Sequence, residues 1–168
     1  MSFYDKINND EISSFIGGGK TYTFNKQGRI TNTEENEYSH DVLISPKGEE
    51  NYLCGTINIS QTPSSGLKIE GGNLQLFKWL ADNTNVEWTG YYNGGKKASD
   101  CADCTMYTSH ENDSCASIPS SNCDTMIHSH PNWAGFTPSS DDYQALDEVR
   151  EQGVTTGLIY NRGKIREI

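Results

Sequence analysis

The stretch TMIHSHPNWAGFTPSSDD, residues 125–142, predicts a strand, a loop and the start of a helix. Alternate side chains of a strand share one face, so we expect His128 and His130 to project together. Pro131 ends the strand because it has no N–H to donate, and Asp142 falls in the first turn of the helix. Two histidines on a rigid strand and a nearby carboxylate are ligands of the kinds that zinc binds, with a fourth position left for water.

The composition indicates one acidic domain with a small core. The chain has 168 residues, of which only 33% are apolar, and its mean hydropathy is -0.71. The net charge of -10 argues against nucleic acid and anionic membrane surfaces as partners, because no basic patch is available. No apolar run reaches membrane-spanning length, and the N-terminus has no signal-peptide core. We expect a monomer; whether it belongs to a longer exported chain is left open.

Four of the five cysteines fall within a short loop-rich segment. They are Cys101, Cys104, Cys115 and Cys123, whereas Cys54 stands apart. Two disulfides or a zinc knuckle with four thiolate ligands would each staple such a segment. The knuckle usually has a second Cys-x2-Cys pair, which is missing here, so disulfides or mixed redox states are favoured. Reduced thiols remain an alternative.

The order of the predicted elements indicates an α+β fold with a mixed β-sheet and helices packed on it. We divide the chain into an N-terminal lead-in with a β-hairpin, residues 1–50, and a main domain, residues 51–168. The predicted elements are a hairpin over 20–33, strands over 41–44, 52–60, 86–92, 105–108 and 125–130, helices over 73–83 and 141–152, and a final hairpin over 154–168.

The two helices show apolar residues at helical spacing. Asn73 follows two glycines and is a good N-cap for the first helix. The second is expected to bury Tyr143, Leu146 and Val149. Each helix therefore has one apolar stripe to place on the sheet.

A glutamate on a strand, followed by His-x-His-Pro and then Ser-x-x-Asp at a helix start, resembles the motif of the JAB/MPN (JAMM) metalloproteases. Here the motif comprises Glu87, His128, His130, Ser139 and Asp142. The blocks LFKWLADNTNVEWTG, YTSHEN, HSHPN and TPSSDD are similar to the JAB-like toxin domain at the C-terminus of Rhs-type polymorphic toxins. The resemblance covers about residues 74–168.

This resemblance implies a zinc peptidase with a JAB/cytidine-deaminase-like sheet. His128, His130 and Asp142 would hold Zn²⁺, Glu87 would act as general base and then acid, and Ser139 would donate a hydrogen bond to the oxyanion. The implied reaction is hydrolysis of an amide or isopeptide bond in a protein or peptide. The resemblance also implies a bacterial effector, secreted or delivered into a target cell within a larger toxin, with a cognate immunity protein as partner.

One departure from the family pattern concerns the loop before the helix. Eight residues separate His130 from Ser139, where the family usually has seven. Counting strictly from His130 would make Asp141 the ligand. We choose Asp142 because Ser139-x-x-Asp142 keeps the internal spacing, and because an extra residue is easily accepted in a loop.

Each motif also has a structural explanation. Ser139 and Asp142 resemble a capping box, which serves any helix start, and Glu87 alone would most often be a solvated strand residue. In combination and order they favour catalysis. The alternatives are a binding-only JAB domain, a peptidoglycan peptidase, and a thiol hydrolase that uses Cys123 or Cys115 with His110.

Overall fold

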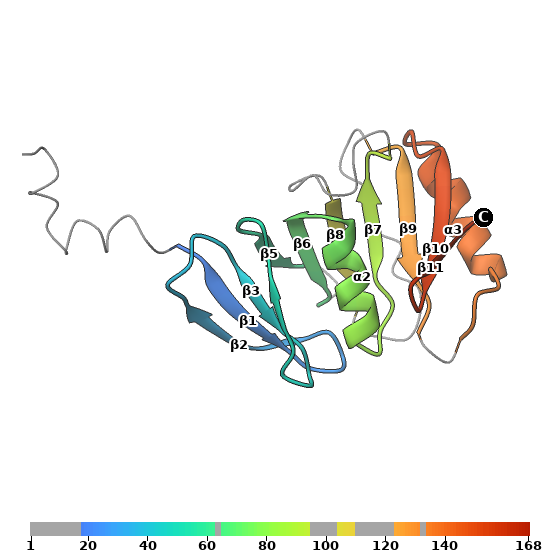
Figure 1. Ribbon diagram of the computed structural model, residues 1–168. Helices are drawn as coiled ribbons and strands as arrows, with labels where there is room; N and C mark the ends of the chain where they lie inside the picture. Colours follow the sequence, from blue (N-terminus) through green and yellow to red (C-terminus); the bar gives the residue numbers. More distant parts are fainter. Residues whose placement is uncertain (1–17, 63–64, 95–103, 110–122, 132–133) are drawn as a thin grey trace, which may run out of the picture.

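The computed structural model describes residues 18–62, 65–94, 104–109, 123–131 and 134–168. In these residues the chain forms two mixed β-sheets and two helices, which confirms the predicted α+β fold. The smaller sheet has the strand order β2-β1-β3-β4, and the larger has the order β11-β10-β9-β7-β8-β6-β5 (Figure 1). The bounds are β1 Lys20–Phe24, β2 Ile30–Glu35, β3 Val42–Ile44, β4 Glu50–Tyr52, β5 Asn58–Gln61, β6 Leu67–Gly72, α2 Leu74–Asn83, β7 Thr89–Tyr92, β8 Cys104–Thr108, β9 Thr125–Ser129, α3 Ser140–Arg150, β10 Thr156–Asn161 and β11 Lys164–Glu167.

The N-terminal hairpin is confirmed, and it forms half of the smaller sheet. The side chain of Asn25 accepts hydrogen bonds from the backbone N–H groups of Gln27 and Arg29 and so closes the turn between β1 and β2. The buried carboxylate of Asp41 accepts from the N–H groups of Lys20 and Ile57, at 2.6 and 2.7 Å. Because these residues come from β1 and from the segment before β5, Asp41 ties the smaller sheet to the larger one.

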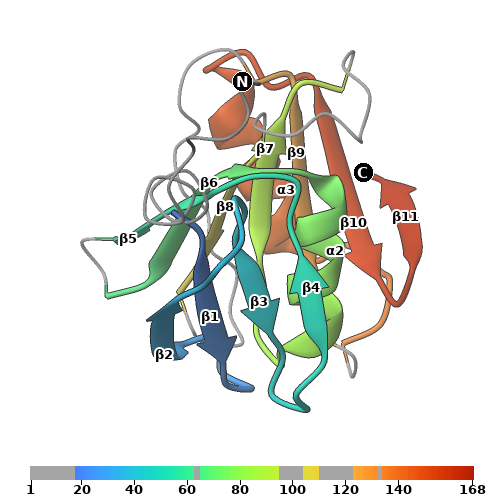
Figure 2. The ribbon, with the colours of Figure 1, turned by 60° about the vertical axis from the view of Figure 1, so that its left-hand side comes forward.

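The main core lies between the larger sheet, α2 and the smaller sheet (Figure 2). Asn73 caps α2 as predicted, because its side chain accepts from Leu76 N. Phe77 packs over Gly90 of β7, where an added Cβ would lie 3.0 Å from the Phe77 ring. Phe24 of β1 meets Trp79 edge-on. Burial of the apolar side chains of α2 therefore fixes the positions of both sheets around this helix.

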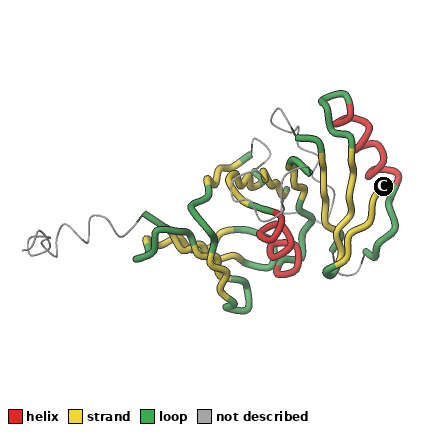
Figure 3. Tube along the Cα trace, turned by 45° about the horizontal axis from the view of Figure 1, so that its top comes forward, coloured by secondary structure: helices red, strands yellow, loops and turns green. Residues whose placement is uncertain are grey.

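A second, smaller core lies on the other face of the larger sheet, beneath α3 (Figure 3). Leu146 and Val149 of α3 pack there with Tyr91 and Met126, as the helical spacing predicts. The expected burial of Tyr143 is wrong: its side chain is 51% exposed. The α3 helix is therefore anchored by a narrow apolar stripe, and most of its surface faces solvent.

Three expectations about local structure are corrected. The strand predicted over 52–60 is two strands, β4 and β5, which belong to different sheets. The strand β6 was not predicted. Two disulfides within the cysteine-rich segment are excluded, because Cys104 and Cys123 form no disulfide whereas Cys54 is disulfide-bonded. The mixed redox state that was favoured beside them agrees with this finding.

Other expectations are not tested. His110, Cys101 and Cys115 lie outside the described residues, and the division of the chain at residue 50 stays a prediction. No helix in the described part of the chain is long and apolar enough to cross a membrane.

Candidate metal centre

The site is built at the end of β9, which lies in the sheet between β7 and β10. His128 is in register with Ile159 of β10 and with Thr89 of β7. The ladder continues to His130, whose N–H donates to Tyr160 O at 3.0 Å. Because His128 and His130 are two residues apart in extended backbone, both imidazoles project on the α3 side of the sheet, as predicted.

Asp142 is brought to the histidines by the cap of α3. Ser139 is the N-cap, and its hydroxyl accepts from Asp142 N at 3.2 Å. In return, the Asp142 carboxylate accepts from Ser139 N at 2.6 Å. This reciprocal capping box turns the Asp142 side chain back toward the helix start, where it is buried, whereas Asp141 is exposed.

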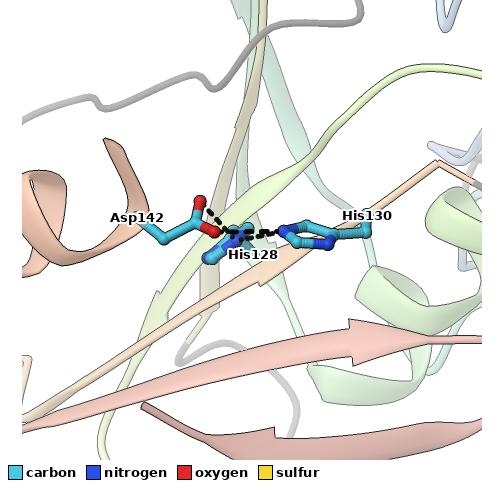
Figure 4. Close-up of side chains that lie close together, drawn as sticks. All are labelled: His128, His130 and Asp142. Atoms are coloured by element: carbon cyan, nitrogen blue, oxygen red, sulfur yellow. Dashed lines mark hydrogen bonds and ion pairs between the residues drawn. The ribbon is translucent and has the colours of Figure 1, made fainter. Parts of the chain in front are cut away.

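His128, His130 and Asp142 form a compact cluster of three potential metal ligands (Figure 4). The Nε2 atoms of the two histidines are 3.0 Å apart, and carboxylate oxygens of Asp142 lie 3.0 Å from His128 Nε2 and 3.3 Å from His130 Nε2. Ligand atoms about 2.1 Å from a tetrahedral zinc ion are about 3.4 Å from each other, slightly more than the distances in the metal-free cluster. The donor set and the spacing therefore fit zinc.

The three side chains also perturb each other's pKa values. Burial tends to raise the pKa of Asp142, but hydrogen bonds from His128, His130 and Ser139 N outweigh it and hold that pKa well below its usual range. The hydrogen bond with Asp142 raises the pKa of His130, against an opposing effect of burial. Without a metal, the cluster therefore favours an ionised carboxylate beside a protonated imidazole.

This charge pattern predicts the pH dependence of stability for the metal-free protein. The lowered pKa of Asp142 adds stability above about pH 4, and this stability is lost as the pH falls. The raised pKa of His130 adds stability below about pH 6.5, and this stability is lost as the pH rises. In chelator, we expect the urea midpoint to be higher at pH 5.5 than at pH 3.5 or 8.5.

With saturating zinc the order of pH 5.5 and 8.5 should reverse, because protons compete with the metal for the imidazoles. Asp142→Asn should flatten the profile in chelator. A midpoint in chelator that rises steadily from pH 3.5 to 8.5 would contradict this description of the cluster.

Glu87 lies just before β7 and not on the strand, which corrects the prediction. Its backbone is nevertheless fixed. Trp88 N donates to Ser129 Oγ at 2.9 Å, and Ser129 N donates to Trp88 O at 2.8 Å. Thr108 Oγ1 donates to Glu87 O at 2.8 Å. Continuing the β7–β9 register places Glu87 opposite His130 on the same side of the sheet. Its carboxylate contributes to the raised pKa of His130.

Ser139 lies at the rim of the site. It is exposed, and its hydroxyl oxygen accepts from Asp142 N. Because a hydroxyl can accept and donate at the same time, the Ser139 O–H can still donate a hydrogen bond to a bound substrate. The residue is thus a helix cap and a potential donor at the same time.

Sequence reasoning missed Asn161, the last residue of β10. Its carboxamide donates to the carbonyl groups of His130, Pro131 and Gly135. In the sequence this asparagine precedes Arg162 and Gly163 and indicates only a turn, so no local signal relates it to the histidines.

The described geometry brings all five predicted site residues to one end of the larger sheet. Residues 70–147 match the family model described as JAB-like toxin 1, and the matched segment runs from β6 into α3 and contains all five. No curated protein and no solved structure matches the chain. Residues 70–147 of this protein are therefore similar to a JAB-like toxin domain.

Proposed function

We propose that this protein is a zinc-dependent peptidase that hydrolyses amide or isopeptide bonds, and that it acts as the toxic effector of a larger polymorphic toxin. The observation that carries the proposal is the cluster of His128, His130 and Asp142, with 3.0–3.3 Å between ligand atoms. Three protein ligands that leave a position for water are typical of catalytic zinc. A structural site would instead have four protein ligands.

The tautomer of His130 also suits a metal. Its Nδ1 lies 3.1 Å from Gly135 O, and a carbonyl oxygen can only accept, so Nδ1 carries the proton. In the neutral imidazole that binds a metal, the Nε2 lone pair is then directed toward the cluster. This arrangement, in which the second ring nitrogen donates to a backbone carbonyl, is the usual one for histidines that bind metals.

A bound zinc ion would supply a Lewis acid that polarises the scissile carbonyl and acidifies the attacking water. Glu87 would take the proton from that water and return it to the leaving amine. The hydroxyl proton of Ser139 would go into a hydrogen bond with the oxyanion of the substrate. No side chain forms a covalent bond to the substrate in this scheme.

The toxin family supports further proposals about context. The domain would be delivered into a target cell as part of a larger secreted toxin of the Rhs type, and a cognate immunity protein would bind it. Its substrate would be a protein or peptide, because the net charge of -10 disfavours the phosphate backbone of nucleic acids. We propose that it acts as a monomer.

The test is a mass-spectrometric search for new N-termini and cleaved isopeptides in a bacterial proteome exposed to zinc-loaded protein. We expect cleavage products that are missing after treatment with chelator and return with zinc. Products from murein but not from protein would favour a peptidoglycan peptidase. A protein that binds zinc and cleaves neither would favour a binding-only domain and would contradict the proposal.

Replacing Ser139 with alanine should lower the cleavage rate by about 10²–10³-fold, because one oxyanion donor is lost. The variant should also lose about 0.5–2 kcal/mol of stability with the N-cap. The rate is measured on a substrate from the proteome search and the stability by urea unfolding. Ser139→Thr keeps both the hydroxyl and the cap, so it should retain most activity. Equal rates for the alanine variant and the wild type would leave Ser139 as a helix cap only.

A further inference from the structure

The side chain of Asn161 makes an unusual set of contacts near the candidate metal centre. Asn161 is 9% exposed, and its Nδ2 lies 3.2 Å from His130 O, 3.3 Å from Pro131 O and 3.1 Å from Gly135 O. All three partners are carbonyl oxygens, which can only accept, so the NH₂ end of the carboxamide must face them. Two hydrogens serve three acceptors, so at least one hydrogen is shared.

One of these carbonyls, that of Gly135, also accepts a hydrogen bond from the candidate metal ligand His130. Gly135 O accepts from His130 Nδ1 at 3.1 Å and from Asn161 Nδ2 at the same distance. Gly135 itself has a φ of +77° and lies in an exposed loop. The direction of the Gly135 carbonyl therefore depends on hydrogen bonds from other groups. The buried carboxamide of Asn161 donates one of them.

We propose that Asn161 is a positioning residue of the metal centre. Its carboxamide holds Gly135 O where that carbonyl accepts the Nδ1 proton of His130, which leaves Nε2 of His130 free for the metal. The inference rests on the proposed function, because it assumes that His130 binds zinc. It concerns a residue outside the matched segment 70–147.

The contacts indicate more than attachment of a loop. Asn161 comes at the end of β10, next to the position where His130 N donates to Tyr160 O. The carboxamide therefore contacts the backbone of the candidate ligand His130, of Pro131 just after it, and of Gly135, whose carbonyl accepts from the ring of His130. Removing it would loosen His130 at both its backbone carbonyl and its ring.

The test compares zinc affinity, measured by competition with a chromophoric chelator, for the wild type, Asn161→Ala and Tyr160→Phe. Tyr160 is the matched control, because its buried side chain donates to Asp82 at 2.6 Å and does not reach the loop. We expect Asn161→Ala to bind zinc about 10–100-fold more weakly, as is typical when the group behind a ligand is lost. Tyr160→Phe should bind as the wild type does, although it also loses a buried hydrogen bond.

A second measurement reports on the ring of His130 in the zinc-loaded protein. The Nδ1 proton of His130, followed by NMR, should exchange with solvent faster in Asn161→Ala than in Tyr160→Phe or the wild type. If Asn161→Ala does not fold, Asn161→Ser keeps one donor. It should bind zinc more weakly than Tyr160→Phe does.

The outcomes separate the two claims. Suppose that the wild type binds zinc, and that the folded Asn161 variant and Tyr160→Phe have the same zinc affinity and the same exchange rate of the Nδ1 proton. That result would overturn the inference but not the proposed function. Zinc binding that depends on Asn161, without any hydrolysis, would overturn the proposed function and leave the inference standing. A wild-type protein that binds no zinc would overturn both.

Discussion

Replacing Glu87 with glutamine should lower hydrolysis by about 10²–10⁴-fold, the usual contribution of a general acid–base. Glutamine has nearly the same shape but cannot take a proton from water. The zinc ligands are three other residues, so zinc content should not change. Growth inhibition on expression in a bacterial host should disappear together with the cleavage of substrate.

The matched control for this variant is Glu34→Gln, which makes the same change in charge on β2 of the smaller sheet. It should keep wild-type toxicity. Zinc content and the urea midpoint are measured for both variants, so that loss of metal or of folding is recognised. Equal toxicity of Glu87→Gln and the wild type would remove Glu87 from the catalytic machinery.

The second large effect is expected at Asp142. Asp142→Asn keeps the size of the side chain but removes the charge that faces His128 and His130, and we expect zinc affinity to fall by more than about 100-fold. That exceeds the usual effect of groups that only support a ligand. Because an amide oxygen can still accept from Ser139 N, the helix should remain capped.

Asp141→Asn is the control next to it. This carboxylate is exposed and precedes Asp142 in the same first turn, so it tests whether any negative charge there suffices. We expect unchanged zinc affinity. A loss of zinc affinity in Asp141→Asn that equals the loss in Asp142→Asn would contradict the assignment of Asp142 as the metal ligand. Competition titration with a chelator measures both.

The arrangement of the three candidate metal ligands could be predicted from local sequence patterns. The two-residue repeat of a strand places His128 and His130 on one face, and a capping box at Ser139 directs Asp142 inward. The choice between Asp141 and Asp142 depended on the internal spacing of the cap. The structure places Asp142 beside the histidines because the cap and the cluster use the same carboxylate.

The features that the sequence did not predict depend on contacts between distant segments. Glu87 is held before β7 because Ser129 Oγ accepts from Trp88 N and Thr108 Oγ1 donates to Glu87 O, and no local pattern contains these contacts. The apolar residues of 52–60 end up in two sheets because Asp41 fixes the chain between β4 and β5. Tyr143 fits the helical spacing, but it lies outside the small core beneath α3 and its side chain stays exposed.

The role of Asn161 could not be predicted for the same reason. Its three acceptors lie 26 to 31 residues earlier in the chain, and they meet it only because β10 lies beside β9 in the sheet. Periodicity and capping describe single elements. Side chains that join the ends of two neighbouring strands become visible only when the sheet order is known.

Zinc content, measured by elemental analysis of the purified protein after growth with added zinc, tests the central claim most directly. We expect about one zinc ion per chain in the wild type and none in a variant that carries both His128→Ala and His130→Ala and still folds. Stoichiometric zinc in the wild type that disappears with the two histidines would support the metal centre. A wild-type protein without zinc, or a double variant that keeps it, would contradict the account.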